Sequence, residues 1–576
     1  MFKINLPFKL SKMMLLVICL LALIVGRSYF HAGLPQTHDG NNHLARFANY
    51  KIAFKEGQIP PRLAPNLMNH YTYPVFNYNY PLANLLSLPF SALKIPYETT
   101  FKLIALAFLF LGGVGVVRLI ESVFAYQKLL KQKNQALSQW SIIFGLGIYY
   151  SAVYLSNLIL IRGNIGEIMA YGLWPWMLTS VLSQPKFNLS NICLWTSWWL
   201  VHNIMAVFGW PILILVAILK HGRQLIVWKK FLALGLVSLL LSLWFWLPAL
   251  AELNLVSAGH SQIVSDAPKH LLSLGQVFFG TTQFGFSRVG GVDDLSFSLG
   301  TIQVVVLVLS LAGLINLTFA KLKGLSSSRQ TNSKCPKTAV AWQILLALCI
   351  ALIFVQLTTS QHLWSLIKPW QLIQFPWRLS FFIPPFVVIL AVFVWQAINS
   401  KWLKMFLVLV LIYQLLGIVN FKPESIVHQP NSYWDAFPES STTSNEDKPL
   451  GFKYLLIADW QPAPFITGGE GQATIRFWNG TRHSYQLGLV TDATIIEPVM
   501  MFAGWQTRVN GQLIEHVDSD DIQGRLAFKL PSGEYQVETR FTQQTPARIT
   551  GNTISLLTAL GVLIYLTFKT DATFSS

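Results

Sequence analysis

Cysteine and charge are both scarce in this chain of 576 residues, which contains four cysteines and only 12% charged residues. Residues 421–552, the most polar region, contain no cysteine, so this region is not held together by disulfides. The sequence also lacks Cys and His at metal-binding spacing, a phosphate-binding glycine-rich loop and a heptad run. These absences argue against a disulfide-rich module, a zinc module, a nucleotide-binding loop and a coiled coil. The cysteines are Cys19, Cys193, Cys335 and Cys349.

The chain is rich in long apolar segments, and 53% of its residues are hydrophobic. Segments of about 18 or more apolar residues can cross a bilayer. Such segments recur along the chain, and they predict a mainly α-helical, polytopic membrane protein with about 12 spans. The first segment follows Lys3, Lys9 and Lys12 but has no clear signal-peptidase site, so we interpret it as a retained anchor. The predicted spans lie near 13–30, 100–120, 140–160, 168–184, 189–205, 207–220, 231–250, 299–320, 339–358, 379–397, 403–420 and 553–568.

The formal net charge of +17 follows the predicted topology. With the N-terminus inside, the cytoplasmic segments hold 20 of the 42 Lys and Arg, but only Glu121 and Asp571 among the 25 acids. This positive-inside bias predicts cytoplasmic N- and C-termini and contact with anionic lipid at the cytoplasmic face. It accounts for the basic excess without a nucleic-acid partner. The expected location is a plasma (inner) membrane.

The predicted domains follow from these segments. Residues 1–420 form a transmembrane domain with outer loops 31–97, 251–298 and 359–378, of which 361–378 is expected to be a helix in the outer interface that ends at Arg378. Residues 421–552 form a small extracytoplasmic β-sandwich, and 553–576 form the last span and a cytoplasmic tail. Alternating polar and apolar residues predict the strands, and Asn479-Gly480, Asn510-Gly511 and Pro531-Ser532-Gly533 predict turns between them. The predicted strands start at Ala473, Tyr485, Thr494, Arg525 and Tyr535.

The first outer loop carries the first candidate site. Asp39 and His43 are four residues apart, so they share a face of any helix that starts near Asp39. Ionisable groups beside a membrane segment are costly to desolvate, which favours a functional site. The alternative is a solvated loop in which Asp39 caps a helix. Both interpretations are open on this spacing alone.

Five further candidates are expected on the outer side near the membrane: Arg62, Arg162, Glu167, His202 and Arg378. Arg162 could bind a phosphate bidentately, or it could simply pair with Glu167. His202 has the side chain best suited to titrate near neutral pH, although a lone histidine at a helix end is more often structural. The long loop 251–298 is also expected to be functional or disordered.

The first outer loop resembles a known family. THDGNNHLARF (37–47) followed by GQIPPRL (57–63) resembles the first outer loop of polytopic glycosyltransferases with the GT-C fold. Residues 162–167, 198–203 and 374–378 resemble a bacterial group of membrane proteins labelled "6-pyruvoyl-tetrahydropterin synthase-related". We do not infer pterin chemistry from that label, because no soluble pterin-enzyme metal site is recognisable. The end of the chain, at 502–512 and 530–537, resembles the outer β-domain of YfhO-type relatives.

The GT-C resemblance implies a mechanism. Asp39 matches the carboxylate that acts as general base on the acceptor hydroxyl or positions it, and Glu167 would be a second acid. Arg62, Arg162 and Arg378 would stabilise the leaving phosphate, while His43 or His202 would donate to it. The donor would be a polyprenyl-phosphate sugar, and the acceptor an envelope glycan, lipid or protein.

The resemblance does not decide whether a metal takes part, and no other cofactor is expected. Some family members use a divalent metal such as Mg²⁺ or Mn²⁺ and others do not. Fold does not determine activity either. A non-catalytic transporter or assembly factor for lipid-linked envelope polymers is the alternative function, and a scaffold whose β-domain binds glycan is a third.

Overall fold

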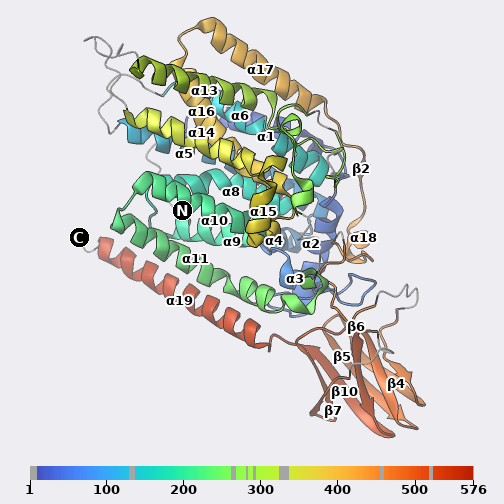
Figure 1. Ribbon diagram of the computed structural model, residues 1–576. Coiled ribbons are helices and arrows are strands. Elements are labelled where there is room, and N and C mark those ends of the chain that lie inside the picture. Colours follow the sequence, from blue (N-terminus) through green and yellow to red (C-terminus); the bar gives the residue numbers. More distant parts are fainter. Residues whose placement is uncertain are drawn as a thin grey trace.

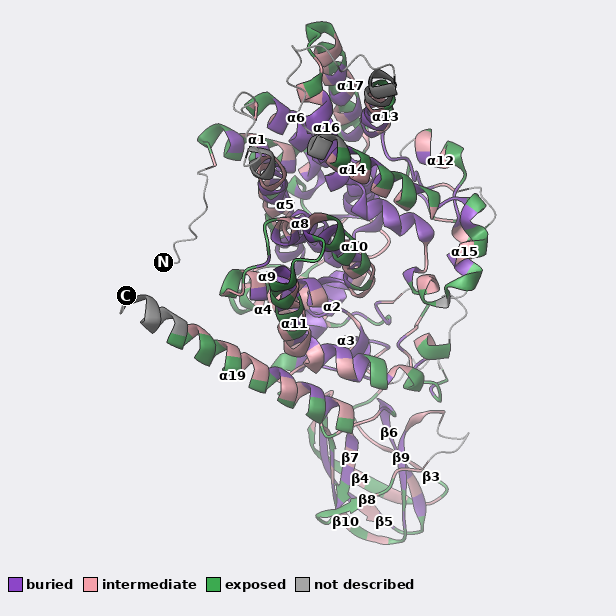
Figure 2. Ribbon diagram, turned by 60° about the vertical axis from the view of Figure 1, so that its left-hand side comes forward, coloured by how far each residue is buried: buried purple, intermediate pink, exposed green. Residues whose placement is uncertain are grey.

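The computed structural model describes residues 10–128, 137–260, 267–280, 283–289, 293–322, 336–442, 444–453, 460–517 and 523–574. A bundle of helices forms most of the molecule, and a small domain of β-strands lies at one end of it (Figure 1). Helix α1 (Lys12–Val25), near the start of the chain, lies away from the strands, and helix α19 (Pro546–Phe574) extends away from them (Figures 1 and 2). The predicted combination of a helical domain and a C-terminal β-domain is therefore confirmed.

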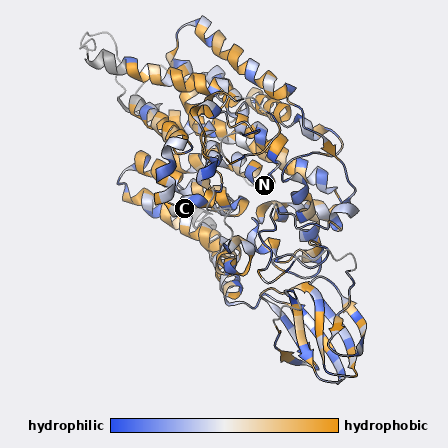
Figure 3. Cartoon of the chain, turned by 45° about the vertical axis from the view of Figure 1, so that its right-hand side comes forward, coloured by the Kyte–Doolittle hydropathy of each residue, from blue (hydrophilic) through white to orange (hydrophobic). Residues whose placement is uncertain are grey.

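The helices follow the apolar segments of the sequence (Figure 3). Their bounds are α1 (Lys12–Val25), α2 (Gly40–Lys55), α3 (Val75–Tyr78), α4 (Leu82–Ala92), α5 (Tyr97–Lys128), α6 (Gln139–Tyr150), α7 (Val153–Asn157), α8 (Ile165–Leu182), α9 (Leu189–Val201), α10 (Asn203–His221), α11 (Leu225–Ala251), α12 (Leu274–Phe278), α13 (Thr301–Leu322), α14 (Pro336–Phe354), α15 (Gln361–Leu366), α16 (Pro384–Ala397), α17 (Lys401–Asn420), α18 (Asn431–Asp435) and α19 (Pro546–Phe574).

Among the described residues, five helices are long and apolar enough to cross a membrane, or seven spans if each of two bent helix pairs counts as one. The five are the first part of α5, all of α10, α11 with the residues that follow it to Leu255, all of α17 and the first part of α19. Several other apolar helices, including α1, are shorter. The structure thus has the helices of a membrane protein, while the count of 12 spans stays a prediction.

Helix α8 lies at the centre of the bundle and is buried along almost its whole length (Figure 2). It packs against α5, α9 and α10. Helix α19 is largely exposed and packs along α11. The first residues of α8 therefore lie inside the protein, which sets the environment of Glu167.

The segment 361–378 differs from the single interfacial helix that we expected. It consists of α15 followed by two 3₁₀ segments, η7 (Lys368–Ile373) and η8 (Pro376–Phe382). Pro369 and Pro376 lack the backbone N–H that a continuous helix needs, and they disfavour helical conformation in the residue before them. Arg378 consequently lies within η8, buried, and not at the end of a helix.

The β-domain contains two antiparallel sheets, with strand orders β4-β5-β10-β7-β8 and β3-β6-β9. All five strands predicted from alternation are present. Asn510 and Gly511 have φ of 50° and 85°, as the two-residue turn between β7 and β8 requires. The bounds are β3 (Phe465–Thr467), β4 (Gly471–Trp478), β5 (Arg482–Leu489), β6 (Ala493–Met500), β7 (Trp505–Val509), β8 (Gln512–Ile514), β9 (Arg525–Leu530) and β10 (Gly533–Phe541).

The segment between α17 and β3 belongs structurally to the helical domain. Its strand β2 (Ile426–Val427) pairs with β1 (Leu34–Pro35), just before α2. Its short helix α18 packs against α2. The two sheets therefore begin at Phe465, later than the predicted domain start at residue 421, and residues 421–442 help to hold the first outer loop.

Candidate functional site

Backbone contacts hold Asp39 at the start of α2. The hydroxyl of Thr37 accepts the hydrogen bond from Gly40 N, at 3.1 Å. Asp39 is at the N-cap position, but its side chain makes no capping hydrogen bond. Its backbone N–H donates to the carbonyl of Arg162, at 2.8 Å. The carboxylate of Asp39 is therefore free of the capping role that we had considered, and it is partly exposed.

A π-helical turn positions Arg162. The predicted third span is broken into α6, α7 and η2 (Leu158–Arg162), which has π-helical geometry, and the two halves meet at 46°. π-turns occur often at functional sites. Gly163 ends the turn with φ of 61°, and an added Cβ would lie 1.9 Å from the Thr37 hydroxyl. Because residue 163 is glycine and has no Cβ, the backbone of Arg162 can approach Asp39.

Asn164 joins three parts of the site. Its amide nitrogen donates to Asp39 Oδ2 at 3.1 Å. Its carbonyl oxygen caps α8 by accepting from Glu167 N at 3.0 Å, and it also accepts from the Tyr80 hydroxyl at 2.8 Å. The same hydroxyl lies 3.4 Å from His43 Nε2. A chain of polar contacts thus links Asp39 to His43, which are the two candidates of the first outer loop.

Glu167 is fully buried and lies between three basic side chains. It pairs with Arg162, and one carboxylate oxygen lies 3.6 Å from both His202 Nε2 and Arg378 Nε. The Tyr154 hydroxyl contacts the other oxygen at 3.3 Å. Neither Glu167 Oε1 nor Arg378 Nε has a hydrogen-bond partner among the described residues. In this closed cluster two guanidiniums face one carboxylate.

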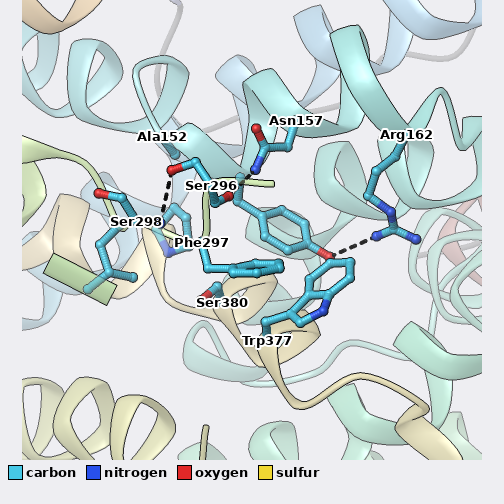
Figure 4. Close-up of a pocket in the computed structure, with 11 residues that line it drawn as sticks. Ala152, Asn157, Arg162, Ser296, Phe297, Ser298, Trp377 and Ser380 are labelled. Carbon is cyan, nitrogen blue, oxygen red and sulfur yellow. Dashed lines mark hydrogen bonds between the residues drawn. The ribbon is translucent and has the colours of Figure 1, made fainter. Parts of the chain in front are cut away.

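Aromatic residues and a small cavity adjoin these charges. Arg162 lies over the Trp377 ring, 4.9 Å from its centre. The cavity between them has a volume of about 20 Å³, enough for one water molecule. Figure 4 shows Arg162, Ser296, Phe297 and Trp377 around it, with Arg162 directed at a tyrosine hydroxyl. Ser296 and Phe297 belong to the outer loop 251–298, so this loop closes the site.

A second part of the same loop covers the start of α2. The His38 ring stacks on Phe286, with centres 4.3 Å apart, and Phe284 packs edge-on against His38 at 5.5 Å. His38 immediately precedes Asp39. The described part of loop 251–298 therefore contacts both sides of the candidate site.

The buried histidine of α2 is held in its neutral form. Desolvation, followed by the charge of Arg46 and the neighbouring His202, lowers the pKa of His43 well below its usual value. His202 accepts a hydrogen bond from Met205 N through Nδ1, at 3.4 Å. Its neutral form therefore carries the proton on Nε2, the atom directed at Glu167.

Arg62 makes a different set of contacts. It is fully buried, and its guanidinium donates to the Trp244 carbonyl at 2.5 Å and to Gln543 Oε1 at 3.3 Å. Trp244 lies four residues before Pro248 within α11, and proline has no N–H to bond that carbonyl. Arg62 thus replaces the missing helix hydrogen bond. Its contacts are structural, and it lies outside the Asp39 cluster.

Six of the seven sequence candidates converge, and three further polar residues complete the cluster. Asn164, Tyr80 and Tyr154 were not predicted as site residues, although Asn164 and Glu167 have the Asn-x-x-Glu spacing that is typical of a helix N-terminus. Within the described ranges, no three His, Cys, Asp or Glu residues come close enough together to hold a metal ion. The residues here do not fit a dedicated Mg²⁺ or Mn²⁺ site, and we derive no step through a metal.

Comparison with known proteins gives a narrow result. No protein-family profile matches the chain, and no curated protein matches it. Two solved structures do resemble it. Both are cryo-EM structures of the arabinofuranosyltransferase AftD from Mycobacteria, one of them a mutant.

The first covers 72% of this chain at 16% identity with a TM-score of 0.43, and the second covers 72% at 14% identity with a TM-score of 0.38. This chain spans only 27% and 28% of their lengths. At these TM-scores the likeness carries no weight for activity. The resemblance to the synthase-related and YfhO-type groups stays a prediction.

Proposed function

We propose that this protein is a membrane glycosyltransferase. It would transfer a sugar from a polyprenyl-phosphate carrier to an envelope glycan, lipid or protein on the outer face of a bacterial inner membrane. One observation supports this most directly: the partly exposed carboxylate of Asp39 lies beside a buried cluster in which Arg162 and Arg378 converge on the single carboxylate of Glu167. A base thus adjoins a site for an anionic leaving group.

In this proposal Asp39 is the general base. The acceptor hydroxyl loses its proton to Asp39 as its oxygen forms a bond to the anomeric carbon of the donor. The bond from that carbon to the phosphate oxygen breaks, and the phosphate leaves with the electron pair. Asn164 holds one oxygen of Asp39, which leaves the other free to receive the proton.

Arg162 and Arg378 would stabilise the leaving phosphate, whose charge grows as the bond breaks. Arginine binds phosphate oxygens through two parallel hydrogen bonds, and Arg378 Nε has no partner among the described residues. Glu167 then has a different role from the second acid suggested by the resemblance. Because it pairs with Arg162 and is fully buried, it orients the two guanidiniums instead of exchanging a proton with substrate.

His202 and His43 would assist as neutral groups. Nε2 of His202, which carries the proton in the neutral tautomer, is directed at the charged cluster. The cavity of about 20 Å³ holds one water and no sugar ring, so Ser296 and Phe297 must move aside before a donor enters. The outer loop would therefore open for each turnover.

The test compares the wild type with Asp39→Asn after purification and reconstitution. Both receive radiolabelled polyprenyl-phosphate sugars and a crude envelope acceptor. Asparagine preserves the shape and removes the base, so we expect transfer to fall by about 10²-fold or more. Glu424→Gln is the matched control, because Glu424 is an exposed acid in the segment that borders the same loop.

The results separate the candidate functions. Transfer by the wild type and by Glu424→Gln, but not by Asp39→Asn, supports the proposal. Equal transfer by all three proteins means that Asp39 is not the base. If all three bind the lipid donor and none transfers sugar, the transporter or assembly-factor function is favoured instead.

A further inference from the structure

A second cavity lies outside the Asp39 cluster, between helices α2, α4, α11 and α19. Its volume is about 350 Å³. The walls are mainly apolar, and several of the side chains that form them are exposed at the surface, with Leu556 62% exposed. The lining residues that matter here are Tyr50, Phe54, Ile59, Trp244, Asn552 and Leu556. We call this space the α2–α19 crevice.

The crevice opens toward the bilayer. Helix α19 is a candidate span that the protein buries very little, and its exposed face continues from Leu556 through Leu560 to Leu563. Trp244 lies seven residues before the end of α11, and Asn552 lies six residues after the start of α19. At 1.5 Å per residue, both are about 10 Å from the outer ends of their helices. In the predicted topology this depth is the upper part of the outer leaflet.

Two polar atoms in the crevice have no hydrogen-bond partner in the described part of the chain. They are the hydroxyl of Tyr50, whose side chain is 1% exposed, and Oδ1 of Asn552. In a membrane no bulk water is present to satisfy such atoms. A hydroxyl can donate to a phosphate or ester oxygen, and an amide oxygen can accept from a hydroxyl. A ligand that carries both kinds of group could therefore pair with both atoms.

The charge behind the crevice favours an anion. Arg62 lies next to Trp244, on the protein side of the crevice, and Arg548 lies near it. Glu252 is the carboxylate that pairs with Arg548, and it faces both guanidiniums. Arg62 Nη1 has no hydrogen-bond partner in the described chain. Positive charge is thus in excess on this side.

We propose that the α2–α19 crevice binds one anionic phospholipid whose headgroup carries a hydroxyl, such as phosphatidylglycerol. Its phosphate accepts from the Tyr50 hydroxyl and is attracted by Arg62, and its headgroup hydroxyl donates to Asn552. One acyl chain follows Phe54, Ile59 and Leu556 into the bilayer. Tyr50 is about 16 Å along α2 from Asp39, so this lipid is distinct from any donor at the Asp39 cluster.

Native mass spectrometry of the full chain tests the proposal. The protein is stripped of lipid in detergent and titrated with phosphatidylglycerol or with phosphatidylcholine. We expect one tightly retained phosphatidylglycerol. Tyr50→Phe should weaken its binding about tenfold, the effect of one lost hydrogen bond to a charged group. Because the Tyr50 hydroxyl has no hydrogen-bond partner among the described residues, this variant should fold normally.

A matched pair of substitutions tests the position. Leu556→Trp fills the crevice and should abolish the retained lipid, while Leu563→Trp makes the same change two turns along the exposed face and should keep it. Equal retention of the two lipids, or equal behaviour of the two tryptophan variants, would show ordinary annular lipid and overturn the proposal. If Leu556→Trp fails to fold, Tyr50→Phe decides. None of these readouts depends on transferase activity.

Discussion

Asp39 takes its position from bonds made by its neighbours. Thr37 caps the helix, Arg162 accepts from the Asp39 backbone, and Asn164 holds its carboxylate. The carboxylate can therefore be partly exposed and still be fixed in direction. A base needs both properties to act on a hydroxyl that enters from outside.

Asn164→Asp tests this arrangement at a single residue. Aspartate caps a helix as well as asparagine does, so α8 should persist. The new carboxylate takes the place of a donor 3.1 Å from Asp39, which disfavours the ionised form of the pair. We expect the acid side of the pH–rate profile to move up by about one unit or more. The measurement is transfer rate against pH.

Asn188→Asp is the control for that variant, because Asn188 caps α9 in the same way and is not part of the Asp39 cluster. Its pH profile should match the wild type. An unchanged profile for Asn164→Asp in active protein would show that Asn164 does not position the base.

His43 sets a pH dependence of stability. Burial lowers its pKa in the folded protein well below the value of about 6.5 in an unfolded chain. Below pH 6.5 the unfolded state binds a proton that the folded state excludes. The contribution to stability is therefore full above pH 6.5 and is lost as the pH falls from there toward the lower folded value, at up to about 1.4 kcal/mol per unit.

Melting temperatures in detergent between pH 5 and 8 measure this effect. The melting temperature should fall less steeply with decreasing pH in His43→Gln than in the wild type. His31→Gln, at an exposed position, should retain the wild-type slope. Parallel slopes for His43→Gln and the wild type would exclude His43 as the source.

At the scale of elements, breaks in helices create the site and its supports. The π-turn that ends at Arg162 brings that residue to α2. Prolines within α8 and α11 leave the carbonyls of Tyr171 and Trp244 without helix partners, and these accept from the Tyr149 hydroxyl and from Arg62. Side chains distant in sequence thus connect helices by donating to the carbonyls that a proline leaves without a helix hydrogen bond.

A double-mutant cycle on Arg62 and Pro248 tests the element-scale role. Arg62→Met leaves the Trp244 carbonyl without its partner and should destabilise the protein by about 1–3 kcal/mol. Pro248→Ala restores a backbone N–H for that carbonyl, so Arg62→Met should cost less in this background. The expected coupling energy is about 0.5–3 kcal/mol, measured from unfolding free energies.

Pro211→Ala supplies the comparison, because Pro211 lies inside a different helix, α10. The change in unfolding free energy caused by Pro211→Ala should add to that caused by Arg62→Met. Strict additivity with Pro248→Ala as well would mean that Arg62 does not serve the Trp244 carbonyl.

For the whole molecule, one buried ion pair joins the bundle to the β-domain. Arg548, at the start of α19, donates to Glu252 at the end of α11, at 2.7 Å. It also donates to the Thr542 carbonyl just after β10, and Glu252 accepts from Thr545. The connection between the last strand and the last helix is thereby attached to the bundle.

Arg548→Met should loosen this connection. Methionine removes the ion-pair partner of the buried Glu252 carboxylate, which keeps only the more distant charge of Arg62 and hydrogen bonds from neutral side chains such as Asn77, so we expect a cost of up to about 3–5 kcal/mol. We expect faster limited proteolysis between β10 and α19, followed by mass spectrometry of the fragments. Arg540→Met, at an exposed position of β10, should be cleaved at the wild-type rate. If Arg548→Met is as resistant to cleavage as the wild type, other contacts must hold the connection between β10 and α19.

Local patterns predicted many of the helices and five of the described strands. Alternation and turn residues predicted the β5 and β10 segments, because side-chain period and turn geometry are properties of a few adjacent residues. Local patterns failed at 361–378, where two prolines turned an expected helix into 3₁₀ segments. They also misplaced the start of the β-domain, since β2 pairs with β1 from the other end of the chain.

The sequence by itself determined that long apolar segments form helices and that Asp39, Arg162 and Glu167 are unusual beside them, because charge near lipid is costly wherever it occurs. Only the tertiary structure decided which of these charges meet. In the tertiary structure Glu167 lies between Arg162 and Arg378, and Asn164 links this cluster to Asp39. Arg62 lies apart from them and donates to the Trp244 carbonyl. These choices depend on helix crossings and backbone breaks, which bring together residues far apart in the chain.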